Sequence, residues 1–339
     1  MELKLHTFEL PLRHPFGISR GTISVQPTLI VELEENGVRG YGEATTNDYY
    51  GYTLENMSEA LEQVRAELRR TTLTDPTSLW DQLRPQLGTN PFAQCALDQA
   101  AHDLWGKKLG QPVYRLWGLT TDHLPPTNYT IGIADIDVMV AKMQEFPNWP
   151  VYKIKLGTDH DLEIVRELRK HTSSVFRVDA NCGWEPDQTI RLSRELKPLN
   201  VEFIEQPLAA HRWEAMRQVY AESALPVVAD ESCQVEADVA RCANHFHVIN
   251  IKLVKCGGLT PARRMIAQAR QLGLKVMVGC MTESTVGISA IAQLLPLLDY
   301  VDMDGALLLA RDVASGVTIE QGHCRYPKTN GCGVTLLSE

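Results

Sequence analysis

Val-Tyr-Lys-Ile-Lys, at residues 151–155, is the first of five short apolar runs in the middle of this chain that each end in a charged residue. The charged residues that end the five runs are Lys155, Asp179, Glu205, Asp230 and Lys252. They lie 22 to 26 residues apart, about the length of one strand, one helix and two short loops. This repeat predicts a parallel (β/α)8-type barrel, in which the carboxyl ends of all strands lie on one face. We therefore expect three carboxylates and two lysines to meet in one pocket.

Two further runs, at residues 275–279 and 300–304, continue the pattern toward the C-terminus, and residues 128–132 are the expected first strand. A helix is predicted at 187–196, between two of the strands. A barrel of this kind takes ~250 residues, whereas the chain has 339. The excess predicts a second unit, so the fold class is α/β with an additional domain.

The N-terminal residues have the order typical of an α+β unit, because strand-like segments come before helix-like segments. Strands are expected at 1–10, 27–35 and 37–43, a loop at 14–21, and helices at 54–70 and from Asn90 onward. We predict an α+β capping domain over residues 1–125 and the barrel over residues 126–312. The C-terminal segment, residues 313–339, is expected to pack back on the capping domain.

The overall composition limits the classes of partner. A formal net charge of −9 argues against a nucleic-acid partner, which requires a basic face. No apolar stretch approaches the ~20 residues of a membrane span, and the first ten residues alternate like a strand rather than forming a signal-peptide core. None of the eight cysteines lies in a Cys-x-x-Cys pair. We expect reduced thiols, a cytoplasmic location, and no nucleic-acid or membrane partner.

Three carboxylates are predicted to bind a divalent metal ion. Asp179, Glu205 and Asp230 end consecutive strands, and neighbouring strands lie about 4.8 Å apart. Three buried carboxylates would repel one another without a cation between them. An all-oxygen site of this kind suits Mg²⁺, and we expect one ion per subunit. The residues that follow the ligands in sequence are expected to orient them; they are Asn181, Gln206 and Glu231.

Lys155 and Lys252 flank the predicted metal ligands on the strands before and after them. A positive field from the metal and from Lys153 is expected to lower the pKa of these lysines toward neutrality. A lysine tuned in this way can take a proton from carbon. Two alternatives are a counter-ion to the acids and a Schiff-base lysine, although a Schiff-base enzyme does not require three carboxylates.

These residues lie in motifs that resemble those of the enolase superfamily, muconate-lactonizing subgroup. The motifs are Gly40-Tyr41-Gly42-Glu43, Lys153-Ile154-Lys155, Asp179-Ala180-Asn181, Glu205-Gln206-Pro207, Asp230-Glu231-Ser232, Asn250-Ile251-Lys252 and residues 278–284. The resemblance covers nearly the whole chain. It implies a lysine base, with Mg²⁺ stabilising an enediolate.

Asp302-Met303-Asp304, at the eighth strand, is similar to the Asp-x-Asp signature of the dipeptide epimerases in that subgroup, of the L-Ala-D/L-Glu epimerase type. A dipeptide brings a free ammonium group into a pocket that already holds lysines, and carboxylates at the strand end would bind it. An acidic strand-to-loop turn without such a role is the simpler alternative. Other residues expected to line the substrate pocket are Thr130, Lys153, Met281 and Glu283.

Substrate specificity is expected to lie in two loops of the capping domain, at 14–24 and 45–53, which can close over the mouth of the barrel. Arg20 in the first loop would suit an acidic second residue of a dipeptide. Asp48, Tyr49 and Tyr50 in the second loop would instead suit a cationic or hydrophobic side chain. The sequence leaves both classes open.

The resemblance implies an isomerase that epimerises a dipeptide at the α-carbon of its C-terminal residue, by proton transfer between two lysines on opposite faces. Other reactions of the superfamily share the metal and the lysines: those of a cycloisomerase, an o-succinylbenzoate synthase or an N-acylamino-acid racemase. A binding barrel that has lost catalysis is an alternative from another class. The expected partner is a small-molecule substrate, and assembly into a homo-oligomer is implied by resemblance alone.

Overall fold

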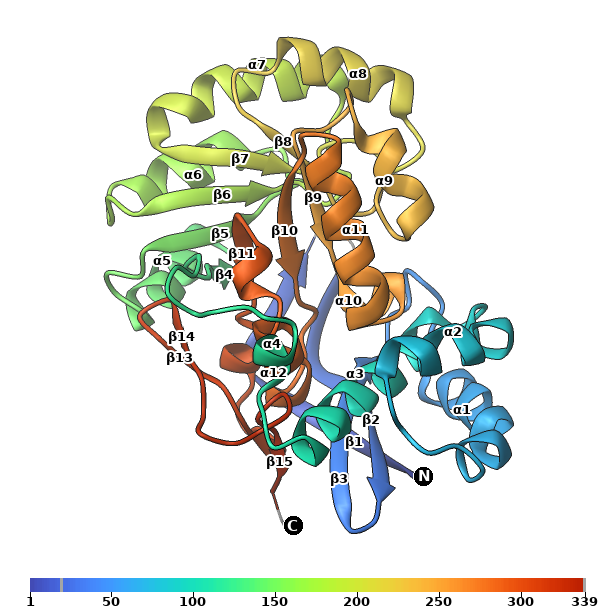
Figure 1. Ribbon diagram of the computed structural model, residues 1–339. Helices are drawn as coiled ribbons and strands as arrows, with labels where there is room; N and C mark the ends of the chain where they lie inside the picture. The colour runs from blue at the N-terminus through green and yellow to red at the C-terminus, as the bar shows by residue number, and fades with distance from the viewer. Residues whose placement is uncertain (19–20, 338–339) are drawn as a thin grey trace.

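The structure of the protein is a computed structural model that describes residues 1–18 and 21–337. Figure 1 shows an N-terminal sheet with its helices below a ring of alternating strands and helices. None of the helices among the described residues is long and apolar enough to cross a membrane.

Eight parallel strands form a single sheet in which each strand pairs with the next one along the chain. Thr127, just before the first of these strands, pairs with Val301 in the last one and so brings the two edges together. The strands are β4 (Tyr129–Ile131), β5 (Val151–Lys155), β6 (Val175–Asp179), β7 (Val201–Glu205), β8 (Val227–Ala229), β9 (Val248–Ile251), β10 (Lys275–Gly279) and β11 (Tyr300–Asp302). The predicted barrel is confirmed, and its strands end at or within two residues of the predicted positions.

Helices follow the strands and cover the outside of the sheet (Figure 1). Their buried faces repeat with helical period; α6, for example, buries Ile164, Val165 and Leu168. The α-helices of the barrel are α5 (Ile136–Glu145), α6 (Asp161–Arg169), α7 (Pro186–Leu196), α8 (Trp213–Glu222), α9 (Glu236–Cys242), α10 (Leu253–Cys256), α11 (Leu259–Gln271) and α12 (Thr285–Ala292). Short 3₁₀ turns are η1 (Lys197–Leu199), η2 (Leu295–Leu297) and η3 (Gly305–Leu308).

The N-terminal residues form a three-stranded antiparallel sheet that packs against helices. Gly40 and Gly42 allow α3 to lie directly on β3, because a Cβ added at Gly42 would lie 2.1 Å from the carbonyl oxygen of Ala96. The elements are β1 (Glu2–Ile18), β2 (Gly21–Glu35), β3 (Val38–Thr45), α1 (Leu54–Leu68), α2 (Pro76–Leu87), α3 (Pro91–Lys108) and α4 (Val113–Leu116). The predicted strands-then-helices order is therefore confirmed.

The expected loop at residues 14–21 is wrong for the residues that the structure describes there. The antiparallel pairing of β1 with β2 resumes after an irregularity between Pro11 and Phe16, and Gly17 lies opposite Thr22. Pro15 lies within the irregularity, where a strand tolerates a residue that has no N–H group to donate. The result is a long two-stranded arm. Its Gly17 carbonyl accepts a hydrogen bond of 2.9 Å from the Ile133 amide of the barrel.

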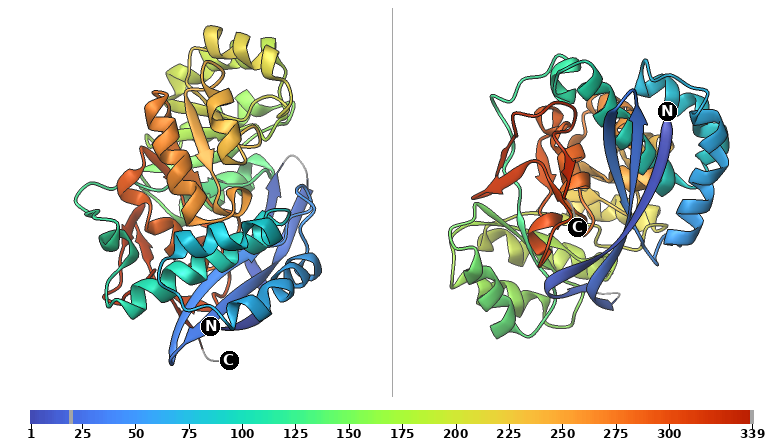
Figure 2. Two further views of the ribbon diagram at one scale, coloured as in Figure 1. Left: turned by 45° about the vertical axis from the view of Figure 1, so that its right-hand side comes forward. Right: turned by 90° about the horizontal axis from the view of Figure 1, so that it is seen from below.

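The C-terminal segment contains β12 (Ala314–Ser315), β13 (Thr318–Glu320), β14 (His323–Arg325) and β15 (Thr335–Leu336). On the capping side, the Val113 amide donates to the Gly331 carbonyl at 2.9 Å. On the barrel side, the Tyr326 hydroxyl donates to the Ala292 carbonyl at 2.5 Å. Figure 2 shows this red segment beside the blue capping sheet when the molecule is seen from below. The segment thus contacts both parts of the molecule.

Candidate active site

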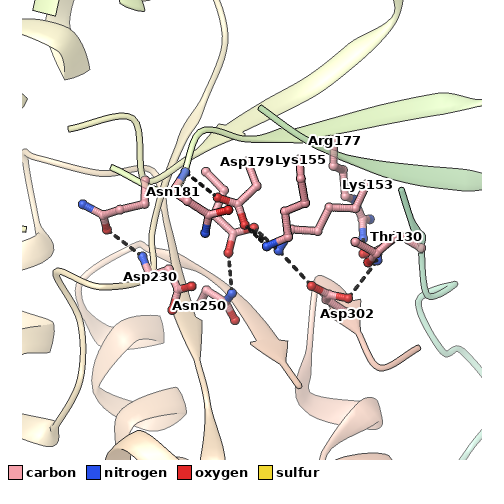
Figure 3. Close-up of polar contacts among 12 residues, drawn as sticks. Thr130, Lys153, Lys155, Arg177, Asp179, Asn181, Asp230, Asn250 and Asp302 are labelled. Carbon is pink, nitrogen blue, oxygen red and sulfur yellow. Dashed lines mark hydrogen bonds and ion pairs between the residues drawn. The ribbon is translucent and has the colours of Figure 1, made fainter. Parts of the chain in front are cut away.

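Strand register brings the predicted residues to one level of the barrel. Lys155 on β5 lies opposite Asp179 on β6, and Asp179 lies opposite Glu205 on β7. Asp230 directly follows β8, and Lys252 directly follows β9. Figure 3 shows Lys153, Lys155 and Asp179 directed toward one another, with Asp302 beside Lys153. The five residues predicted to meet therefore all lie at the carboxyl ends of the barrel strands.

The three predicted metal ligands are almost completely buried, each with at most 1% of its surface exposed. Lys153 Nζ lies 3.1 Å from an oxygen of Asp179 and 2.7 Å from Oε2 of Glu205. That Glu205 oxygen nevertheless accepts no well-oriented hydrogen bond. Lys252 Nζ lies 2.8 Å from Asp230. Ammonium groups thus lie directly against the carboxylates.

A different group of side chains has its potential ligand atoms within 4.8 Å of one another in the part of the chain that the structure describes: Cys280, Asp302 and Asp304. Asp179, Glu205 and Asp230 do not form a group that meets this criterion. The group at Cys280 already has a cation beside it, because Lys153 Nζ lies 2.9 Å from Asp302.

The surroundings of the three carboxyl groups give them different pKa values. Burial and the charge of Asp179 raise the pKa of Glu205 to about 7. Burial also acts to raise the pKa of Asp179, but Lys155 and Lys153 lower it to about 2. For Asp230 burial is likewise outweighed, because Lys252 and Lys255 lower its pKa. Glu205 is therefore the carboxylate whose negative charge is least compensated by the protein.

Lys252 and Lys153 directly contact carboxylates, which act on the lysine pKa in the opposite direction to neighbouring cations; the expected lowering by a metal ion stays a prediction. Burial lowers the pKa of the Lys252 ammonium, but the adjacent Asp230 raises it above its ordinary value. Lys153 behaves in the same way: Asp302, Glu205 and Asp179 outweigh burial and raise its pKa. The prediction of the lysine pKa values considered the neighbouring cations but not the carboxylates that directly contact each lysine.

Gln206 links two of the loops that carry metal-ligand candidates. Its backbone has a left-handed φ of 34°, and its Oε1 accepts hydrogen bonds from the amides of Asp230 at 2.9 Å and Ser232 at 3.1 Å. The backbone amide of Asn181 donates a hydrogen bond of 2.9 Å to Oδ1 of Asp179. The Glu231 side chain is buried, and its charge favours the protonated form of Lys252.

Two residues that sequence reasoning did not place in the site hold it in shape. Lys255 Nζ is buried and donates to Oδ1 of Asp230 at 2.6 Å and to the Cys233 carbonyl at 3.0 Å. Asn250 Nδ2 donates to Oε1 of Glu205 at 2.8 Å. A signal for Asn250 was present, since it lies two residues before Lys252 along a strand and therefore on the same face. Lys255 offered no such signal, because it lies on the short helix α10.

Asp302 and Asp304 are buried at the end of β11. Asp302 accepts hydrogen bonds from Lys153 at 2.9 Å and from Asn128 at 2.8 Å. Asp304 accepts a hydrogen bond of 2.5 Å from the Thr130 amide, and burial together with Asp302 raises its pKa well above the ordinary value. The candidate ammonium-binding residues therefore lie one strand from Lys153, where β11 meets β4.

The loop at 45–53 lies against the loop that follows β10. Asn47 Nδ2 approaches the Met281 sulfur at 3.9 Å, and Tyr49 is 48% exposed at the outer part of its loop. Tyr50 is half-buried and packs its ring edge-on to that of Tyr49. Glu283 lies deeper than expected: it is 4% exposed, and burial and Glu43 raise its pKa well above the ordinary value. Arg20 lies outside the described residues.

Comparisons with known proteins assign the chain to a family. The family model for the mandelate racemase / muconate lactonizing enzyme N-terminal domain matches residues 2–118, and the enolase C-terminal domain-like model matches residues 138–339. The chain belongs to the mandelate racemase and muconate lactonizing enzyme family. The enolase-superfamily resemblance stated from the motifs is confirmed.

Relatives within the mandelate racemase and muconate lactonizing enzyme family are named as epimerases. An L-Ala-D/L-amino acid epimerase of Flavobacterium johnsoniae is 59% identical over 99% of this chain and 100% of that protein. An L-Ala-D/L-Glu epimerase of Bacteroides thetaiotaomicron is 39% identical over 99% and 88% of the two chains. A dipeptide epimerase of Cytophaga hutchinsonii, solved with Mg and D-Ala-L-Val, has a TM-score of 0.94 at 27% identity and covers 99% and 96% of the two chains.

Proposed function

We propose that this protein is a Mg²⁺-dependent dipeptide epimerase, an isomerase that inverts the α-carbon of the C-terminal residue. The observation that carries the proposal is the pair Lys155 and Lys252 on either side of Asp179, Glu205 and Asp230. The lysines end or follow the second and sixth strands of an eight-strand ring, which are nearly opposite one another. Two bases on opposite faces of one carbon are what inversion by proton transfer requires.

The residues present fit a divalent cation. Asp179, Glu205 and Asp230 supply oxygen donors only, which suits Mg²⁺. Glu205 has a pKa raised to about 7 by burial and Asp179, although Lys153 Nζ lies 2.7 Å from its Oε2. A further cation at this position would therefore offset a negative charge that the lysine compensates only in part. A bound Mg²⁺ supplies positive charge that stabilises negative charge developing on the substrate carboxylate.

The chain's own groups would bind the substrate and move its proton. One lysine takes the α-proton and the other, still protonated, delivers a proton to the opposite face. Asp302 and Asp304 would bind the free ammonium of the dipeptide, and Asn250, Gln206 and Lys255 keep the carboxylates in place through the hydrogen bonds described above.

We propose an L-alanyl dipeptide as the substrate, supported by the name of the Flavobacterium relative at 59% identity. A relative with one of the alternative kinds of activity, an N-succinyl-L-Arg/Lys racemase of Bacillus cereus, is 31% identical to this chain. The cysteines form no disulfide in the part of the chain that the structure describes, which supports our further proposal of a cytoplasmic location. Assembly into a homo-oligomer stays a prediction.

A library of L-Ala-X dipeptides incubated with enzyme and Mg²⁺ in D₂O tests the proposed function. Mass spectrometry should detect one deuterium per molecule at the C-terminal residue, together with the opposite diastereomer. Turnover of a muconate or a succinylbenzoate precursor, with no exchange in any dipeptide, would contradict the proposal. A hydrophobic, cationic or acidic X that exchanges fastest would identify the preferred second residue.

A further inference from the structure

Glu43 joins the capping domain to the barrel through a fully buried carboxylate. The residue lies on β3, and none of its surface is exposed. Its Oε2 accepts hydrogen bonds from the Ser284 hydroxyl at 2.5 Å and from the Gly287 amide at 3.0 Å, and its Oε1 accepts one from the Ser284 amide at 3.0 Å. Thr28 on β2 donates a further bond of 2.8 Å. Negative charge at the start of α12 satisfies amides that have no partner within the helix.

The loop directly before α12, residues 280–283, reaches the candidate active site. Cys280 Sγ lies 4.0 Å from Asp304 Oδ1. Glu283 folds back to accept a hydrogen bond of 3.1 Å from the Met281 amide. The other side of the loop packs closely on Gly305, where an added Cβ would lie 2.4 Å from the Met281 carbonyl oxygen. Loop 280–283 is therefore held between the start of α12 and the end of β11.

The loop directly after Glu43 reaches the same place from the capping domain. β3 ends at Thr45, and Asn47 in the loop 45–53 contacts the Met281 sulfur at 3.9 Å. Glu43 therefore lies at the common base of two loops that meet at Met281.

Holding the capping domain against the barrel does not by itself explain why residue 43 is a glutamate. Burial raises the pKa of Glu43, although hydrogen bonds from Ser284 and Gly287 lower it in part. Glu283 is a second buried carboxyl group nearby. An apolar contact of similar volume would join two domains without the cost of burying charge. A carboxylate adds direction, because its oxygens require the donors to lie at fixed positions.

We propose that Glu43 is a positioning residue for substrate binding: it fixes loop 280–283 against loop 45–53, so that the two loops form one wall of the dipeptide pocket. The inference rests on the proposed function for its kinetic consequence. Its structural consequence, the fixed position of the two loops, is independent of turnover.

The test compares Glu43→Ala and Glu43→Gln with a matched control, Asp103→Asn. Asp103 is another fully buried acid of the capping domain. It accepts hydrogen bonds from the Cys332 amide of the C-terminal segment at 2.7 Å and from the Tyr41 amide at 2.9 Å. The control thus neutralises a comparable buried acid at the junction with the C-terminal segment rather than at the two loops.

We expect Glu43→Ala to raise KM for the dipeptide by about tenfold while kcat changes by less than about threefold, since the loss concerns binding rather than proton transfer. Hydrogen–deuterium exchange without substrate should become faster at residues 45–53 and 280–284. Glu43→Gln should give smaller changes in the same direction, because its amide keeps one acceptor oxygen. Asp103→Asn should change neither KM nor the exchange of these loops.

Wild-type KM and wild-type loop exchange in Glu43→Ala would overturn the inference, as would equal effects in Asp103→Asn. If Glu43→Ala does not fold, Glu43→Gln decides, and wild-type values in that variant overturn it. Failure of the wild-type enzyme to epimerise any dipeptide would reject the proposed function instead, and the exchange measurement would still test the position of the loops.

Discussion

Lys155 and Lys252 each lie within 2.8 Å of a carboxylate oxygen, at opposite ends of the row formed by Asp179, Glu205 and Asp230. Their positions could be predicted from the sequence because a strand end has a fixed place in a parallel barrel. The contacts around each lysine could not be predicted in this way, because they depend on which carboxylate lies beside each ammonium group. The same holds for Lys255, whose contact with Asp230 arises from a helical turn rather than from a strand end.

Replacing either lysine by alanine should abolish epimerisation and leave exchange from one face only. Lys155→Ala and Lys252→Ala should therefore exchange the α-proton of opposite diastereomers, measured by NMR in D₂O with each diastereomer supplied separately. We expect a loss of at least about a hundredfold in kcat, since general base catalysis contributes about 10²–10⁴. Lys170→Ala, at an exposed helix end, is the control and should retain full activity. Wild-type turnover in both active-site variants would exclude the two-lysine mechanism.

At the level of elements, the barrel strands could be predicted from apolar runs of four or five residues, and the strands in the structure match these runs closely. The arm formed by β1 and β2 could not be predicted in this way, because Pro15 and two glycines in 14–21 are locally typical of a loop. Pairing with the partner strand overrode that local preference. Helix α2 was also missed, although Asp75 and Pro76 provide a start signal and the Asp75 side chain accepts a hydrogen bond from the Ser78 amide.

The contact between β3 and α3 gives a prediction about stability. Gly42→Ala would place a methyl group 2.1 Å from a backbone oxygen of α3, so the helix must move and lose packing across the capping domain. The free energy of unfolding should fall by about 2–3 kcal/mol, measured by urea denaturation. Arg39→Ala on the same strand removes an exposed ion pair and should change stability by less than about 1 kcal/mol. Equal stabilities of the two variants would contradict the close approach of β3 and α3.

For the whole molecule, four acidic side chains and four lysines meet where the eight strands end. The acids are Asp179, Glu205, Asp230 and Asp302, and the lysines are Lys153, Lys155, Lys252 and Lys255. The net charge of −9 gave no indication of this local balance of charges. It counts all the charged residues of the chain, and most of these lie outside the cluster. Only the closed ring brings Lys153 and Asp302, which are 149 positions apart in the sequence, into one polar cluster.

Mg²⁺ should stabilise the whole protein if the carboxylates bind it. At about a hundredfold excess over Kd, a ligand specific for the folded state adds about 2.7 kcal/mol, which a thermal-shift assay detects as a rise in Tm of several degrees. Glu205→Gln should lose most of this rise. Glu202→Gln, on the same strand but paired with Arg177 away from the triad, should keep it. An unchanged rise in the Glu205 variant would contradict a metal site that includes this residue.

The hydrogen bonds that tie residues 331–332 to Gln111, Val113 and Asp103 have a consequence for how the molecule is made. Ribosomes deliver a chain from its N-terminus at about 5–20 residues per second, so α3 and α4 emerge long before the segment that covers them. All eight ring strands must leave the exit tunnel in the meantime. The junction between cap and tail is thus completed last, after translation of everything that lies between its two halves.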